Sequence, residues 1–152
     1  MKAWSAALLM AGMLAVGTVR PAQAQGRSHI GVHAGYNFDV EKGLIGGQLL
    51  LPIGRRVEIY PSFDYYFVDP GSLFGISGDV KFRFPTGGES VFYAGGGVNW
   101  LRASGGASDT GWDLLFGLES RLGYTHPYVE GRVINHNSSA FQIAVGLNFT
   151  IF

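Results

Sequence analysis

Cysteine is absent from the 152 residues, so the chain can form no disulfide, hold no metal through thiolates and use no cysteine nucleophile. Charged residues are scarce as well, at 14% of the chain, whereas soluble domains average about 25%. The 11 basic and 11 acidic residues balance, so the chain has no basic field that would attract nucleic acid. Beyond residue 24, no apolar run approaches the roughly 20 residues that a membrane helix requires.

The first 24 residues have the pattern of a secretory signal peptide. Lys2 gives a positive start, residues 6–16 form an apolar run, and Ala22-Gln23-Ala24 is a small-residue cleavage signal. We therefore predict that residues 1–24 are removed and that residues 25–152 form one domain beginning at Gln25. Removing Lys2 and Arg20, with no acidic residue, from a chain of 11 basic and 11 acidic residues leaves a net charge of −2.

Residues 73–84 alternate between apolar and polar side chains more clearly than any other stretch. The apolar positions include Phe74, Ile76, Val80 and Phe82, and the polar positions include Asp79, Lys81 and Arg83. A period of two residues predicts a β-strand with one apolar and one polar face. The polar face carries both signs of charge but little bulk, which favours a narrow enclosed space. We interpret the strand as part of a small barrel whose apolar face meets lipid.

The same alternation recurs along the mature chain, and no helical period appears in it. We predict eight strands, at residues 28–38, 44–53, 57–67, 73–84, 90–100, 112–119, 128–133 and 141–151. An even number of consecutively paired strands closes an up-and-down barrel without edges. The predicted fold class is all-β, an eight-stranded antiparallel transmembrane β-barrel. Both termini then lie on one side, and loops at residues 39–43, 68–72, 102–110 and 135–139 lie on the other.

One residue disturbs this pattern. Pro61 falls inside the third predicted strand, where it cannot donate a hydrogen bond to the ladder. We therefore expect a local bulge at Pro61.

Several short segments resemble the small outer-membrane β-barrel family, the OmpA/OmpX-like eight-stranded proteins. They are the A-x-A signal, the strand FYAGGGVNW, the Gly117-Leu118-Glu119 ending, the PYVEGR segment and the terminal Phe152, which is similar to that family's aromatic assembly signal. Phe152 is one residue out of step with the outward set of Phe149 and Ile151, which indicates either a bulge near the end or a weaker assembly signal. The resemblance implies a monomer of the Gram-negative outer membrane, with outer-membrane lipids and the outer-membrane assembly machinery as partners.

The predicted strands divide the side chains into an inward and an outward set. A lumen of eight strands is just wide enough for side chains to fill, so inward charges must be paired. We expect a lumen network of Glu58, Asp79, Lys81, Arg83, Glu119, Glu130 and Arg132, with Asp64 and Asp113 also inward. The expected lipid-facing set is Phe74, Ile76, Val80, Phe82, Phe92, Trp100, Trp112, Phe116 and Phe149. The network favours a filled, structural lumen, and a narrow proton or ion path is the alternative.

Histidines give little sign of metal or cofactor chemistry. His29 and His33 lie on one strand face, about 13 Å apart at the rise of a strand, which is too far for one metal. We assign no metal site and no cofactor, and we expect His126 to be solvated in a turn. The His136-Asn137-Ser138 segment is similar to the catalytic segment of outer-membrane lipid A deacylases, but no acidic residue follows Ser138 to complete a triad.

Three functional interpretations follow from these patterns. The first is a structural or interaction protein of the outer membrane with a filled lumen and no enzymatic activity. The second is a deacylase-like enzyme that uses His136 and Ser138. The third is a soluble, exported, lipocalin-like barrel with apolar residues inward, which its sparsely charged polar face disfavours.

Overall fold

The computed structural model of this chain describes residues 26–151. The predicted signal peptide and the assembly signal at Phe152 lie outside the described residues. Eight strands follow one another: β1 (His29–Asn37), β2 (Lys42–Pro52), β3 (Val57–Tyr66), β4 (Leu73–Pro85), β5 (Ser90–Ala103), β6 (Ser108–Ser120), β7 (Thr125–Asn135) and β8 (Ser139–Thr150). Within residues 26–151 there is no helix that is long and apolar enough to cross a membrane.

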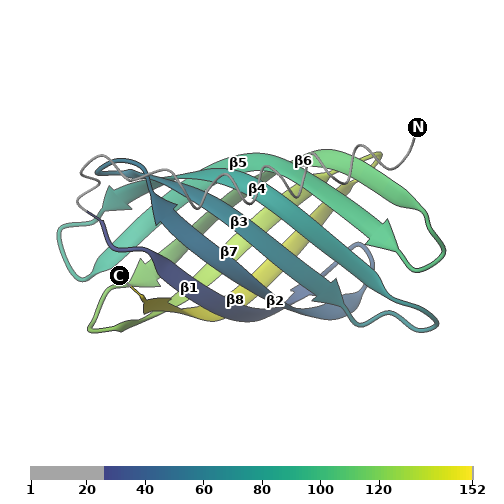
Figure 1. Cartoon of the computed structure of the whole chain (residues 1–152), viewed down its shortest axis with the longest axis horizontal. Coiled ribbons are helices and arrows are strands. Elements are labelled where there is room, and N and C mark those ends of the chain that lie inside the picture. The colour runs from purple at the N-terminus through teal and green to yellow at the C-terminus, as the bar shows by residue number, and fades with distance from the viewer. Residues whose placement is uncertain (1–25, 152) are drawn as a thin grey trace.

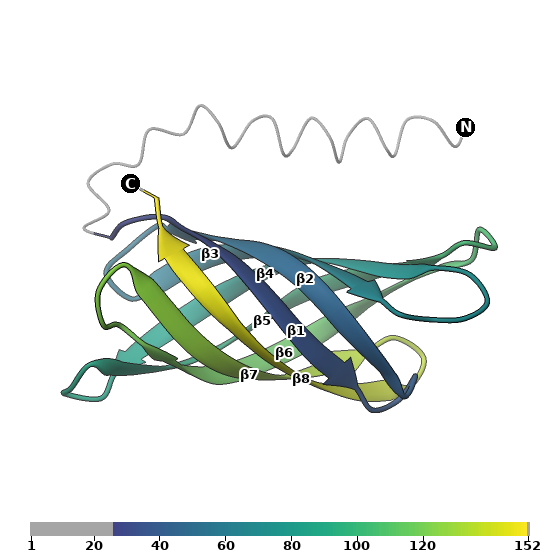
Figure 2. The same cartoon turned by 90° about the horizontal axis from the view of Figure 1, so that it is seen from below.

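The strands form one closed barrel in sequence order, which confirms the predicted fold class. Each strand pairs antiparallel with the next, and β8 closes the barrel on β1, where His29 lies opposite Thr150. The strands cross the long axis of the barrel obliquely (Figures 1 and 2). The start of β1 and the end of β8 therefore share one end, which we call the terminal mouth, and the other end is the opposite mouth.

Strands β5 and β6 are longer than the sequence pattern indicates. Residues 102–110 are polar and rich in glycine and serine, and we expected a loop there. Instead Arg102 pairs with Ser108, and only a short turn joins the two strands. The β5–β6 hairpin and the β3–β4 hairpin both project at the opposite mouth (Figure 1). Backbone pairing between β5 and β6 holds these residues extended, although their side chains do not alternate in polarity.

The polarity of the barrel wall is inverted relative to a soluble protein. Large apolar side chains on the outer surface are exposed, as at Phe63, Phe82 and Leu118, whereas Glu58, Asp79 and Asp113 are almost fully buried. The period of two follows directly from this arrangement, because successive side chains point to opposite faces of the wall.

No bulge occurs at Pro61, so that expectation is wrong. Pro61 lies opposite Gly78 in an uninterrupted β3–β4 ladder. On its other side the β2–β3 ladder lapses between Gln48↔Ser62 and Leu51↔Ile59 and then resumes in the same register. The wall tolerates the missing donor of proline because β4 fixes the position of β3 through this stretch.

Inward-facing glycines of β5 lie against the charged side chains of β4. Gly95 and Gly97 of β5 face inward, opposite Lys81 and Asp79 of β4. A Cβ added at Gly97 would meet the carbonyl oxygen of Gly78 and would lie 2.7 Å from the Cα of Asp79. Gly78 differs, because a Cβ added there would meet nothing within 4 Å.

We predict opposite outcomes for two alanine substitutions in this region. Gly97→Ala forces β4 and β5 apart, and overpacking of this kind lowers the free energy of unfolding by roughly 1–3 kcal/mol. Gly78→Ala adds a methyl group to open space on the outer wall and changes it by less than about 0.5 kcal/mol. Denaturant titration of the refolded barrel in micelles measures both changes. Equal stability of the two variants would contradict the close approach at Gly97.

Candidate functional site

The candidate site is the lumen, where the structure brings the predicted charged residues together in two clusters. We call the first the central cluster, and it consists of Asp79, Lys81, Asp113, Glu130 and Arg132. We call the second the mouth cluster, and it consists of Glu58, Arg83, Glu119, Arg121 and His126. All of these side chains are buried except Arg121, whose side chain is 28% exposed.

Arg132 is the centre of the first cluster. Its guanidinium lies 2.8 Å from Asp113, 3.2 Å from Asp79 and 3.2 Å from Glu130, and it also donates to the hydroxyl of Ser77 at 2.8 Å. These partners come from β4, β6 and β7, so one side chain of β7 links strands on different sides of the lumen. A planar guanidinium with five donors suits this role, because it can serve several acceptors at fixed angles.

Lys81 occupies an aromatic cage beside this arginine. Its ammonium lies 3.5 Å from the ring centroid of Tyr60, 4.0 Å from that of Tyr93 and 3.7 Å from Glu130. The hydroxyl of Tyr93 donates to Glu130 at 3.0 Å. Ring faces and one carboxylate together stabilise a cation that has lost its water.

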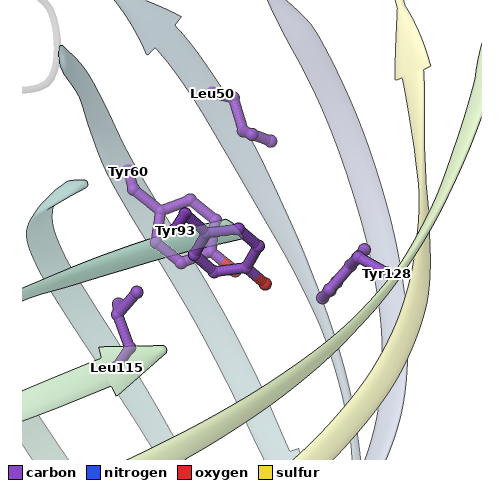
Figure 3. Packing of buried hydrophobic residues seen from close by; sticks show 5 residues of the cluster. All are labelled: Leu50, Tyr60, Tyr93, Leu115 and Tyr128. Atoms are coloured by element: carbon purple, nitrogen blue, oxygen red, sulfur yellow. The ribbon is translucent and has the colours of Figure 1, made fainter. Parts of the chain in front are cut away.

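The aromatic residues also close the lumen at this level. Tyr60 and Tyr93 lie next to each other, with Tyr128 across from them and Leu50 and Leu115 to either side (Figure 3). All five are buried, and Leu50 is 0% exposed. An eight-stranded barrel has little interior space beyond its side chains, so these residues fill it.

The mouth cluster lies nearer the terminal mouth. Glu58 is 3.1 Å from Arg83 and 3.7 Å from Arg121, and Arg121 is 3.2 Å from Glu119. Glu119 also accepts from Asn148 at 3.1 Å and lies 3.6 Å from the ring of His126. The cluster joins the β6–β7 turn to β3, β4 and β8.

Two members of this cluster correct or extend the sequence analysis. His126 is not solvated as expected: it is 6% exposed, and its Nε2–H donates to the carbonyl of Gly123 at 3.0 Å. It begins the inward set of β7, one step before Tyr128. Arg121 was missed, although it continues the inward alternation that runs through Glu119. The turn residues after Ser120 hid that signal.

A third polar group lies on the side of β1 and β2. The His33 ring is 2.6 Å from Asp64 and 2.7 Å from Gln48, and Gln142 donates to Asp64 at 3.3 Å. Gln48 in turn donates to Asn148 at 2.7 Å. Sequence reasoning found no partner for His33, because Asp64 is brought opposite it only by the pairing of β1, β2 and β3.

The predicted outward residues all lie on the outer wall, with two degrees of exposure. Val80, Phe82, Phe92, Trp112, Phe116 and Phe149 are exposed. Phe74, Ile76 and Trp100 are half-buried, because the Phe74 ring packs 5.9 Å from the rings of both Phe63 and Trp100.

The predicted catalytic pair does not form a catalytic arrangement. His136 and Ser138 flank the β7–β8 turn, where the His136 amide donates to the Ser138 carbonyl at 3.2 Å. Across residues 26–151, no side-chain hydrogen bond joins the imidazole to the Ser138 hydroxyl or to a carboxylate, and the buried Nε2 has no partner. The nearby Asp109 carboxylate instead accepts from Asn137 at 3.0 Å. In the same described part of the chain, no three His, Asp or Glu side chains are grouped as a metal site.

Comparison with known proteins finds this fold but no family. No family model matches the chain, and no curated protein matches it. A solved structure from the de novo design of transmembrane β-barrels is similar with a TM-score of 0.66 and 15% identity, covering 83% of this chain and 96% of that one. Neisserial surface protein A is similar with a TM-score of 0.63 and 13% identity, covering 82% and 97%. The outer membrane enzyme PagL is similar with a TM-score of 0.57 and 11% identity, covering 81% and 99%.

These similarities show the architecture of small transmembrane barrels. The same wall occurs in a designed barrel, in a surface protein and in an enzyme, so the fold alone does not select a function. Any function of this chain must therefore come from its own lumen and rim.

We predict that the lumen depends on Arg132. Arg132→Gln leaves three buried carboxylates without their shared cation, and losing one partner of a buried ion pair costs about 3–5 kcal/mol of unfolding free energy. Arg56→Gln, at an exposed turn position, is the matched control and should change it by less than about 0.5 kcal/mol. Urea unfolding in micelles, followed by tryptophan fluorescence, measures both. Similar midpoints for the two variants would contradict a stabilising network.

Proposed function

We propose that this protein is an integral outer-membrane β-barrel with a closed, side-chain-filled lumen and a structural or interaction role. The observation that carries the proposal is the inverted polarity of the wall: exposed aromatic and aliphatic rows outside, and ion pairs inside. In water, that surface would be a large apolar patch of the kind that drives aggregation. In a bilayer it is the solvated face.

The backbone arrangement supports the same environment. Hydrocarbon offers no hydrogen-bond partners, so a membrane-spanning sheet must pair both edges of every strand. The barrel meets that requirement because β8 pairs with β1 along the whole of β1. The predicted signal peptide would take the chain across the inner membrane, and the terminal mouth would face the periplasm. Outer-membrane lipids and the assembly machinery would be its partners, and it would act as a monomer.

A closed lumen argues against an open pore. The central cluster and the Tyr60–Tyr93–Tyr128 group lie across the interior at one level, and Lys81 is 1% exposed. Every charged member of that cluster has an oppositely charged partner. Water or solute could pass only if these ion pairs opened, and a buried charge that loses its partner costs several kcal/mol.

The two alternatives receive less support. A lipocalin-like carrier requires an apolar lumen and a wet outer wall, which is the reverse of the observed arrangement. A deacylase requires a histidine between a serine and a carboxylate, and within residues 26–151 the His136 ring makes no hydrogen bond to either. The outer membrane enzyme PagL has the same architecture, so the non-enzymatic role proposed here rests on the missing contacts and not on the fold.

We predict that the mature protein fractionates with outer membranes and is extracted only by detergent. On gels the folded barrel should migrate differently before and after boiling, because its closed hydrogen-bond network resists detergent denaturation at room temperature. A charge placed on the outer wall tests the lipid contact: Leu114→Arg should cost about 2–4 kcal/mol near the bilayer midplane. Recovery of the wild-type protein from the periplasm without detergent would overturn the proposal.

We also predict that the reconstituted barrel is closed. Vesicles that contain the wild-type protein should retain small ions and sugars as well as lipid-only vesicles do. The variant Tyr60→Ala/Tyr93→Ala removes two rings from the closed level and should increase ion leakage. Gel migration before and after boiling controls for its folding. Sugar uptake through the wild-type protein would contradict a filled lumen.

A further inference from the structure

The terminal mouth contains a hollow that the proposed function does not use. It has a volume of about 440 Å³ and lies among Arg27, His29, Arg83, Arg121, Tyr124 and His126, with Gly26, Gly123 and Thr150 completing its wall. These residues come from the segment before β1, the starts of β1 and β7, the ends of β4 and β8, and the β6–β7 turn. The hollow therefore opens at the rim of the barrel, beyond the level that the tyrosines close.

The wall of this hollow is basic. Three guanidinium groups and two imidazoles line it, and no carboxylate does. Arg83 and Arg121 also line a second, smaller hollow of about 100 Å³ together with Arg55. Arginine forks are suited to bind tetrahedral oxyanions, because two parallel N–H groups meet two oxygens of one phosphate.

Arg83 and Arg121 are held in place by carboxylates, and Arg83 keeps an unused donor. Glu58 and Glu119 fix Arg83 and Arg121 from the lumen side, at 3.1 Å and 3.2 Å. The Nε of Arg83 and the Nδ1 of His29 are buried without a hydrogen-bond partner, whereas the Nε and an Nη of Arg121 lie 3.2 Å from Glu119 and 3.7 Å from Glu58. His29 is 4% exposed and lies 4.9 Å from the ring of His126. Buried polar atoms without partners are rare in folded proteins, and the Nε–H of Arg83 can donate to an anion that enters the hollow.

The charges around the rim also favour an anion at the terminal mouth. The terminal mouth carries Arg27, Arg55, Arg56, Arg83 and Arg121 against Glu58, Glu89 and Glu119. The opposite mouth carries Asp39, Glu41, Asp69 and Asp109 against Lys42 and Arg102. An anion is therefore attracted to the terminal mouth and repelled at the other.

We propose that the hollow at the terminal mouth binds a phosphate group. Two sources share this chemistry: a free phosphate ester and the headgroup of an anionic phospholipid. The headgroup fits the position of the hollow, because Leu122 and Tyr124 on the adjoining turn are 56% and 76% exposed and are suited to the membrane interface. This second source rests on the proposed membrane location, whereas binding of free phosphate does not.

Calorimetric titration of the detergent-solubilised barrel with inorganic phosphate tests the site directly, with acetate as the comparison anion. We expect saturable phosphate binding that is tighter than acetate binding. Arg27→Gln and Arg121→Gln should each weaken it roughly tenfold, the loss of one charge-assisted hydrogen bond. Arg56→Gln, on the same rim but outside the hollow, should leave it unchanged. Arg27 is exposed and makes no ion pair within residues 26–151, so its variant tests binding without disturbing the fold.

Lipid nanodiscs separate the two sources. Nanodiscs with phosphatidylglycerol should protect the wild-type protein from thermal unfolding more than nanodiscs with phosphatidylcholine alone, and Arg27→Gln should remove most of that difference. Phosphate binding without this lipid preference assigns the site to a free phosphate ester. Absence of saturable phosphate binding, equal affinity for acetate, or equal weakening by Arg56→Gln would each overturn the proposal. Failure of the protein to enter nanodiscs would instead overturn the proposed function.

Discussion

A barrel wall without edges is the constraint on which the rest of this structure depends. Once β8 pairs with β1, every strand has a neighbour on both sides and the backbone requires nothing from its surroundings. The side chains alone then decide what the wall can face. Apolar side chains go outward and polar ones go inward, and a lumen this narrow forces the inward groups into contact.

Contact among charges in so small a space requires pairing. Arg132 meets this requirement for three carboxylates, and Lys81 is stabilised by two tyrosine rings and Glu130. The resulting network cross-links strands that are not neighbours in the wall. Its contribution is therefore to the shape of the barrel as well as to its stability, since an eight-stranded sheet held only by its ladders could shear.

Charge is distributed differently in the lumen and at the terminal mouth. Acids outnumber bases in the central cluster, with Asp79, Asp113 and Glu130 against Lys81 and Arg132, whereas arginines outnumber acids at the terminal mouth. Glu58 and Glu119 belong to both regions, because they end the internal network and hold the arginines that line the rim. The same residues that fill the barrel thus hold the arginines of this mouth in place.

The period of two in the sequence determined the fold class and the side of the wall on which nearly every residue lies, because alternation is a property of each strand alone. It could not determine which inward residues meet. Arg132 reaches Asp79, and His33 reaches Asp64, only because successive strand registers add up around the barrel. The same tertiary pairing extended β5 and β6 through polar residues, held Pro61 without a bulge and buried His126. The side of the wall that a residue faces is set within its own strand, whereas its height along the barrel axis depends on the registers of all the strands.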